Sequence, residues 1–257
     1  NDGYFYFRDV ITDGATIFIE VDGTEVARQP VVAAGIKQQR MDFSVTVPSR
    51  GGQAKPGTVS AKNLYDRGKE NTTLMNKAIE AIEYKKPEKA IPHLTQVLAT
   101  DPADHPAWAI LGAAHAATGN EADAEKAFLK ALEIKPDSVP PLISLGRLYM
   151  AQKRFEDVVE TLERATAADP SSAVAFRLLG EGYLQIRKGS KAIPALNEAI
   201  RLQPKEMADC HMLLAKLYDI AGARHLASSE FKLLLQKVPN HPEKDKMKHY
   251  IKENPPQ

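Results

Sequence analysis

Apolar residues after about residue 63 recur three and four positions apart, in two bursts per stretch of 34 residues. This spacing puts them on one face of a helix, so each stretch is predicted to form two amphipathic helices. A proline closes every stretch, at intervals of 34, 34, 34 and 35 residues: Pro102, Pro136, Pro170, Pro204 and Pro239. Proline ends a helix because it lacks the backbone donor and keeps the preceding residue out of helical geometry. The pattern therefore predicts a solenoid whose repeats bury their apolar faces against one another.

One eight-position pattern recurs in register within these repeats. Its clearest copies are Trp108, Leu111, Gly112, His115, Ala124, Phe128, Ala131, Pro136 and Phe176, Leu179, Gly180, Tyr183, Ala192, Leu196, Ala199, Pro204. We expect the small residues Gly112, Gly146, Gly180 and Ala215 to let the first helix of each pair approach the second closely. The spacing and residue set resemble the tetratricopeptide repeat family over residues 63 to 240.

The resemblance implies a mainly α fold, a right-handed superhelical solenoid of about five helix pairs. The expected repeats are 71–104, 105–138, 139–172, 173–207 and 208–241, within a solenoid that occupies residues 63–257. A last helix containing Met247 and Tyr250 among four lysines is expected to cap it.

In this family the first helix of each pair lines a concave groove. The corresponding positions here are Met75, Ile79, Ile82, Ala109, Ala113, Ala116, Ile143, Arg147, Met150, Arg177 and Glu181, continued by Gln185, Met212, Lys216 and Asp219. Their character changes from apolar to charged along the chain, and the apolar part suits a hydrophobic peptide, helix or strand. The family's clamp for a terminal carboxylate is not expected, because only Arg147 is of the right type. The alternative is that this stripe packs within the protein itself.

The first 48 residues follow a period of two instead, which predicts about four antiparallel strands with one buried face. Asp22-Gly23 lies between strand-like runs as a hairpin signal, and Pro30 suits an edge or a bulge. Residues 49–62 are expected to be a linker. The string from Asp2 to Phe7 and the later glycine turns resemble the second half of a carboxypeptidase regulatory-like domain, a transthyretin-like sandwich.

An incomplete sandwich of this kind would expose unpaired strand edges. Either the chain was truncated or its start was not seen, or strands from elsewhere in the chain complete the sheet, or a neighbouring subunit or partner does. In the last case the expected assembly residues are Tyr4, Phe5, Tyr6, Phe7, Phe43, Val45 and Val47. Head-to-tail pairing of this kind does not have to close, so it would build a filament.

Composition excludes several classes of function. The net charge of +1 gives no global field that attracts nucleic acid or anionic lipid. No apolar stretch approaches the roughly 20 residues that span a bilayer. Cys210 is the single cysteine, and no histidine or cysteine spacing gathers metal ligands. No nucleophile motif stands out either. We therefore expect no enzyme activity, cofactor, metal or small-molecule substrate, and membrane association only through an unseen N-terminal anchor.

The sequence thus predicts protein–protein association, with two alternatives. In the first, the β domain pairs with other copies of the chain to build an extracellular or envelope polymer. In the second, the chain is a monomeric adaptor that binds a partner peptide in its apolar groove. A regulatory-like sandwich joined to these repeats resembles bacterial secreted or envelope proteins, so an extracytoplasmic location is expected: secreted, cell-surface or periplasmic.

Overall fold

The computed structural model describes residues 16–21, 24–30, 65 and 67–256. It divides into two compact parts, residues 1–68 and 69–257, each of which is described by itself. Within the first part, strands β1 (Thr16–Val21) and β2 (Thr24–Pro30) pair antiparallel. The register places Thr16 opposite Pro30 and shifts between Ile19 and Glu20. The predicted Asp22-Gly23 turn lies between these strands but outside the described residues, as do the assembly residues Tyr4–Phe7, Phe43, Val45 and Val47 and the linker.

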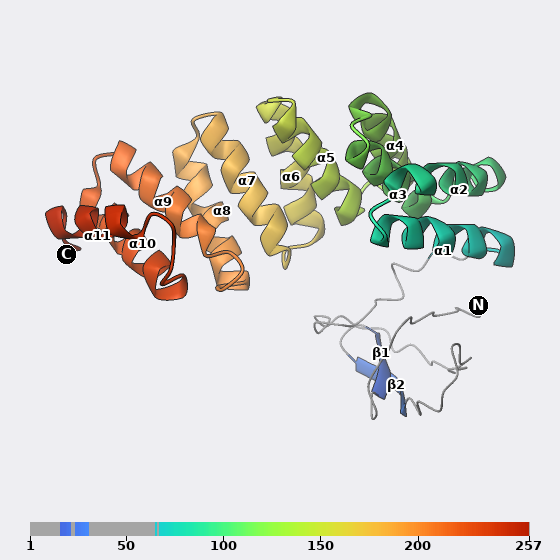
Figure 1. Cartoon of the computed structure of the whole chain (residues 1–257), viewed down its shortest axis with the longest axis horizontal. Helices are drawn as coiled ribbons and strands as arrows, with labels where there is room; N and C mark the ends of the chain where they lie inside the picture. Colours follow the sequence, from blue (N-terminus) through green and yellow to red (C-terminus); the bar gives the residue numbers. More distant parts are fainter. Residues whose placement is uncertain (1–15, 22–23, 31–64, 66, 257) are drawn as a thin grey trace. The chain divides into compact units, whose positions relative to one another are not determined.

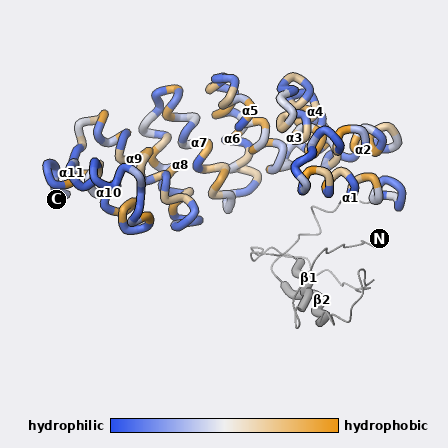
Figure 2. Tube along the Cα trace, viewed as in Figure 1, coloured by the Kyte–Doolittle hydropathy of each residue, from blue (hydrophilic) through white to orange (hydrophobic). Residues whose placement is uncertain are grey.

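The second part is mainly helical, as predicted, with eleven helices in tandem along residues 69–253. Its helices are α1 (Lys69–Glu83), α2 (Pro87–Thr100), α3 (His105–Ala117), α4 (Glu121–Ile134), α5 (Val139–Ala151), α6 (Phe155–Ala168), α7 (Ala173–Gln185), α8 (Gly189–Leu202), α9 (Asp209–Ile220), α10 (Arg224–Lys237) and α11 (Lys244–Glu253). They form an elongated array of antiparallel pairs (Figure 1), which we call repeats 1 to 5 from α1–α2 to α9–α10. Polar and apolar residues are interleaved along the helices (Figure 2), as amphipathic packing requires.

Local sequence explains where many of these helices begin and end. Asp104 precedes α3, and its side chain accepts a hydrogen bond from the backbone N–H of Ala107 at 2.9 Å. This satisfies one of the donors that a helix start leaves free. The repeat-closing prolines fall in the loops just after each second helix. Pro92 and Pro194 are different, because they lie inside α2 and α8.

The two helices of each repeat are joined by a turn of three residues, and one of them is left-handed. It is a glycine in repeats 2 and 5, where Gly119 and Gly222 have φ values of 80° and 76°. In repeats 1, 3 and 4 the same place is taken by Lys85, Lys153 and Arg187, with φ values of 56°, 59° and 58°. A left-handed backbone is unfavourable for any residue with a Cβ, so these three turns carry strain.

Close contact between paired helices depends on glycine, as the sequence predicted. A Cβ on Gly112 would lie 2.6 Å from ring atoms of Phe128, and one on Gly180 would lie 2.6 Å from Leu196. A Cβ on Gly146 would meet Leu162 at 2.9 Å. In each case the partner residue is fully buried. The large side chains of the second helices therefore occupy the space that these glycines leave open.

The core follows the array from repeat to repeat. Consecutive helices pack against each other throughout, and in addition α3 contacts α5 and α5 contacts α7. At the C-terminal end, α11 buries Met247 against Leu234 and Ala208. The rings of Phe231 and Tyr250 meet edge to face with centroids 5.2 Å apart. This helix thus covers the apolar side of repeat 5.

Candidate partner-binding site

The first helices of repeats 2, 3 and 4 lie side by side. Because α3 contacts α5 and α5 contacts α7, the exposed residues of these helices form one continuous surface. We call the groove positions that the sequence predicted on α1, α3, α5 and α7 the inner face. All eleven of those positions lie in described helices, so the structure gives the environment of each.

The N-terminal portion of the inner face is apolar. Ile79 on α1 is 38% exposed, and Ala113 and Ala116 on α3 are exposed. Ile82 and Ala109 are half-buried. Small exposed alanines leave room for bulky side chains of a partner.

Met75 corrects the prediction. It is only 4% exposed and belongs to the core cluster of Ala78, Ala90 and Leu94. Its position on α1 turns it towards α2, so a partner cannot reach it without displacing the core.

On α5 the inner face becomes mixed. Ile143 and Met150 are half-buried and pack against the core cluster of repeats 2 to 4. Arg147, one turn from each of them, is exposed. The two apolar side chains therefore contribute mainly to packing, while Arg147 presents its charge to the open side.

The C-terminal portion carries a charged group. Arg177 forms an ion pair with Glu181 at 2.5 Å and another with Asp209 of α9 at 3.4 Å. The Arg177 and Glu181 side chains are 24% and 26% exposed, so water screens their pairing only in part. Burial raises the pKa of Glu181, and Asp209 adds to the increase, while Arg177 and Arg147 oppose it. The charges of four residues on three helices thus act on one another here.

The sequence reasoning missed Asp209. It lies 32 residues after Arg177, which is close to the length of one repeat, and this spacing was the signal that could have found it. Cys210, next to it, is buried, and burial raises the pKa of its thiol to about 12. It therefore behaves as a small core residue, since the reactive thiolate is suppressed.

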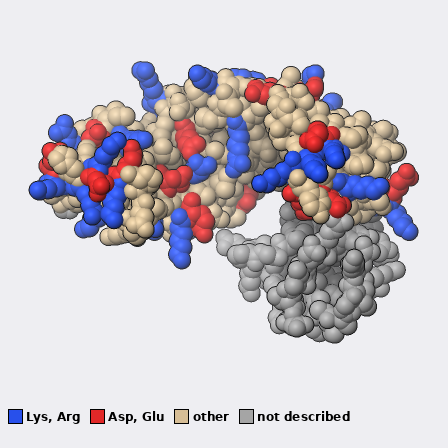
Figure 3. Space-filling model, in the orientation of Figure 1, with Lys and Arg blue, Asp and Glu red and all other residues tan. Residues whose placement is uncertain are grey.

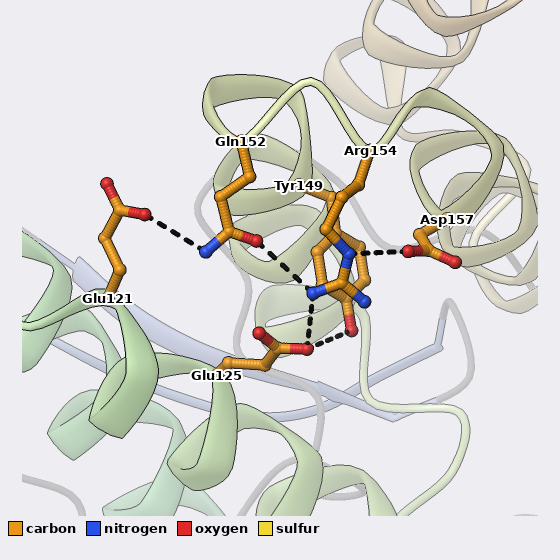
Figure 4. A network of polar contacts seen from close by, with 6 residues as sticks. All are labelled: Glu121, Glu125, Tyr149, Gln152, Arg154 and Asp157. Atoms are coloured by element: carbon orange, nitrogen blue, oxygen red, sulfur yellow. Dashed lines mark hydrogen bonds and ion pairs between the residues drawn. The ribbon is translucent and has the colours of Figure 1, made fainter.

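A second polar group, also unpredicted, joins repeat 2 to repeat 3 (Figure 4). Arg154 donates to Glu125 of α4 at 2.8 Å and to Asp157 at 2.7 Å, and its guanidinium stacks 4.0 Å from the centre of the Tyr149 ring. Tyr149 also donates to Glu125, and Gln152 donates to Glu121. Burial and the bond to Glu125 raise the pKa of Tyr149 to about 12.

These contacts position one repeat on the next. The ion pairs of Arg154 are substantially exposed, at 41% for its own side chain, so each contributes little stability by itself. Their role is to set the orientation of the two repeats, because one planar guanidinium holds α4 against the turn between α5 and α6. Sequence reasoning did not find this group, because its hydrogen-bonded partners are up to 31 residues apart and unlike in type.

A surface hollow of about 510 Å³ lies between α3 and α4. It is lined by Trp108, Leu111 and His115 of α3 and by both apolar and charged residues of α4. None of the predicted groove residues lines it. Across residues 65 and 67–256, no three metal-ligating side chains come together, and no helix is long and apolar enough to cross a membrane.

Comparison with known proteins agrees with the repeat pattern. A family model described as tetratricopeptide repeat matches residues 81–138 and 122–182. Tetratricopeptide repeat protein 37 of Xenopus laevis is 25% identical over 159 residues, which cover 56% of this chain and 10% of that protein. The chain spans only 10 to 19% of the length of the first curated relatives it matches. The family match shows tetratricopeptide repeats over residues 81–182.

Solved structures show the same fold. MamA from Desulfovibrio magneticus RS-1 superposes with a TM-score of 0.62 at 23% identity, covering 68% of this chain and 98% of that one. PilF of Pseudomonas aeruginosa gives a TM-score of 0.63 at 20% identity, covering 72% and 84%. The helical array thus has the same fold as these proteins.

Proposed function

We propose that this chain is a non-enzymatic protein-association module whose tetratricopeptide repeats hold a segment of a partner protein on the inner face. The observation that carries the proposal is the juxtaposition on adjacent first helices of exposed Ala113 and Ala116 with the exposed Arg147. An apolar surface next to charged groups suits a segment whose apolar side chains enter the alanine-lined portion while its polar groups meet the charged one.

The direct test places bulk and charge on the open alanines. Random peptides displayed on phage are selected against the whole chain, and the affinity of a selected peptide is then measured by fluorescence polarisation. Ala113→Arg and Ala116→Arg should each weaken binding by at least tenfold. Both alanines are exposed, so the fold should persist. This makes them better probes than Ile143 or Met150, which pack against the core.

Matched controls are Ala122→Arg on α4 and Ala167→Arg on α6, two exposed alanines of second helices. These variants should bind as the parent chain does. If all four variants bind the selected peptide equally, the inner face is not the binding surface.

Self-assembly through the N-terminal part is a second candidate function. Among the described strands, β1 and β2 pair only with each other, and a two-stranded hairpin is marginal alone. Added strands from another copy would stabilise it. The resemblance of this part to a regulatory-like sandwich supports an extracytoplasmic location, which cell fractionation would test.

Deleting residues 1–48 tests the assembly idea, because residues 69–257 form a compact part of their own. Light scattering should then show polymers of the whole chain and monomers of the shortened one. Polymers that persist after the deletion would refute assembly through the β part.

A further inference from the structure

The three-residue turns inside the repeats lack acidic residues, and those of repeats 1, 3 and 4 each carry two basic ones. Residues 84–86, 118–120, 152–154, 186–188 and 221–223 contain no aspartate or glutamate. Their basic residues are Lys85, Lys86, Lys153, Arg154, Arg187 and Lys188. The turns of repeats 3, 4 and 5 lie along one edge of the helical array, the upper edge in Figure 1. Figure 3 shows basic side chains projecting from this edge. We call it the turn edge.

Backbone geometry alone would not select these residues. Lys153 and Arg187 adopt the left-handed conformation that Gly119 and Gly222 adopt in other repeats. Glycine would avoid the strain at this place. A long basic side chain that persists in an unfavourable backbone conformation indicates a role for the side chain itself.

The positive charge of the turn edge is least compensated in repeats 4 and 5. The first turns of α4 and α6 carry acidic residues, whereas those of α8 and α10 carry none. Arg187, Lys188, Lys191 and Arg224 are all exposed. Among the described residues, none of these four forms an ion pair, although Lys191 lies 5.5 Å above the ring of Tyr183. The neighbouring carboxylate, Asp219, accepts a hydrogen bond from Tyr250.

An apolar side chain stands beside these cations. Ile220 is the last residue of α9, directly before the turn of repeat 5, and it is 85% exposed. No other large hydrophobic residue in the described part of the chain is as exposed. A largely exposed aliphatic side chain at the same edge as four cations without ion pairs is the composition of a surface that meets lipid headgroups.

We propose that the turn edge of repeats 4 and 5 binds an anionic phospholipid surface. Arg187, Lys188, Lys191 and Arg224 pair with phosphate groups, and Ile220 enters the boundary between headgroups and acyl chains. A nucleic acid would also attract the cations, but it gains little from an aliphatic anchor, and single strands favour exposed aromatic rings. Contact along this edge leaves the inner face free, so the inference goes beyond the proposed function.

This surface was not expected from the sequence, because the net charge of the chain is only +1. The fold creates it by bringing residues 187–191 and 220–224 to one edge. Charge within about 10 Å of a surface decides such binding, since salt screens more distant groups.

The experiment is co-sedimentation of the whole chain with vesicles at about 0.1 M salt, where the Debye length is about 10 Å. Vesicles of phosphatidylglycerol and phosphatidylcholine should bind it, and vesicles of phosphatidylcholine alone should not. Each cation removed should lower the partition coefficient about fivefold. The triple variant Arg187→Gly, Lys188→Gln, Lys191→Gln should therefore bind about a hundredfold more weakly. Ile220→Ser should also weaken binding, with the fold unchanged, because the side chain makes little contact with the protein.

A control variant removes the same charge elsewhere: Lys232→Gln, Lys237→Gln, Lys248→Gln, three exposed lysines on α10 and α11. It should stay within about threefold of the parent chain, because its lysines lie away from the turn edge. Equal losses in both triple variants would overturn the proposal, as would absence of binding to anionic vesicles. Binding to a duplex oligonucleotide that needs Arg187 but not Ile220, without vesicle binding, would assign the edge to nucleic acid instead.

Discussion

Replacing Gly112 by alanine tests the packing of paired helices most directly. The added Cβ would lie 2.6 Å from Cδ1 and Cε1 of Phe128 and 3.0 Å from Cγ. Carbon atoms prefer about 3.5–4.0 Å, so three ring atoms are too close by up to about 1 Å. The ring is 1% exposed and has nowhere to move, so α3 and α4 must separate.

Overpacking of this kind costs about 1–3 kcal/mol, and alanine recovers about 1 kcal/mol through its better helix propensity. We therefore expect the free energy of unfolding to fall by about 1 kcal/mol. Urea denaturation followed by circular dichroism measures the change, and hydrogen exchange shows whether it is localised to repeat 2. A single transition is not guaranteed in a repeat array, so the local measurement is the decisive one.

Two further variants sharpen the test. Phe128→Leu frees space, so adding Gly112→Ala to it should cost less than in the parent chain, and the double-mutant cycle reports this coupling. Ala215 occupies the same position in repeat 5, and Ala215→Gly should destabilise because propensity is lost and no clash is relieved. If Gly112→Ala raises the stability of repeat 2, the close-approach argument is wrong.

Four other changes have defined outcomes. Asp104→Ala should lower the free energy of unfolding by about 1 kcal/mol in urea denaturation, because it removes a buried helix cap. Lys153→Gly should raise the free energy of unfolding by about 0.5–1 kcal/mol. This is the gain from relieving the left-handed backbone minus the cost of the extra entropy that glycine gives the unfolded state. Cys210, with its pKa raised to about 12, should resist iodoacetamide until the chain is unfolded, as mass spectrometry would show. The pKa of Glu181 is raised in the folded chain, so its ionised form lowers the free energy of unfolding. Glu181→Gln should therefore unfold at a higher urea concentration than the parent chain at pH 7. The two midpoints should converge as the pH falls below 4.5, where the carboxyl group is protonated in both states.

The repeat pattern was enough to predict the helical array. Gly112, Gly146 and Gly180 recur because a local rule, a small residue opposite a large one, repeats with the chain. Met75 shows the limit of that reasoning. Its register along α1 suggested the inner face, but repeat 1 departs from the pattern and the exact rotation of the helix decides exposure.

Contacts between unlike polar residues could not be predicted. Arg154 pairs with Glu125, which lies 29 residues earlier in the sequence, and neither residue type indicates which partner it will have. The left-handed turns are a similar case, because Lys153 and Arg187 carry no sequence signal for a positive φ such as glycine gives. These features arise from three-dimensional geometry once the repeats have stacked.

The restriction of contacts to nearby helices also bears on how such a chain can change length. Helices separated by more than two positions in the order of the array share no substantial interface. Gain or loss of one complete helix pair would therefore disturb only the two junctions beside it, provided that α11 still covers the last pair. Duplication of one gene segment would lengthen the partner-binding surface by one repeat and leave the core contacts of the other repeats unchanged.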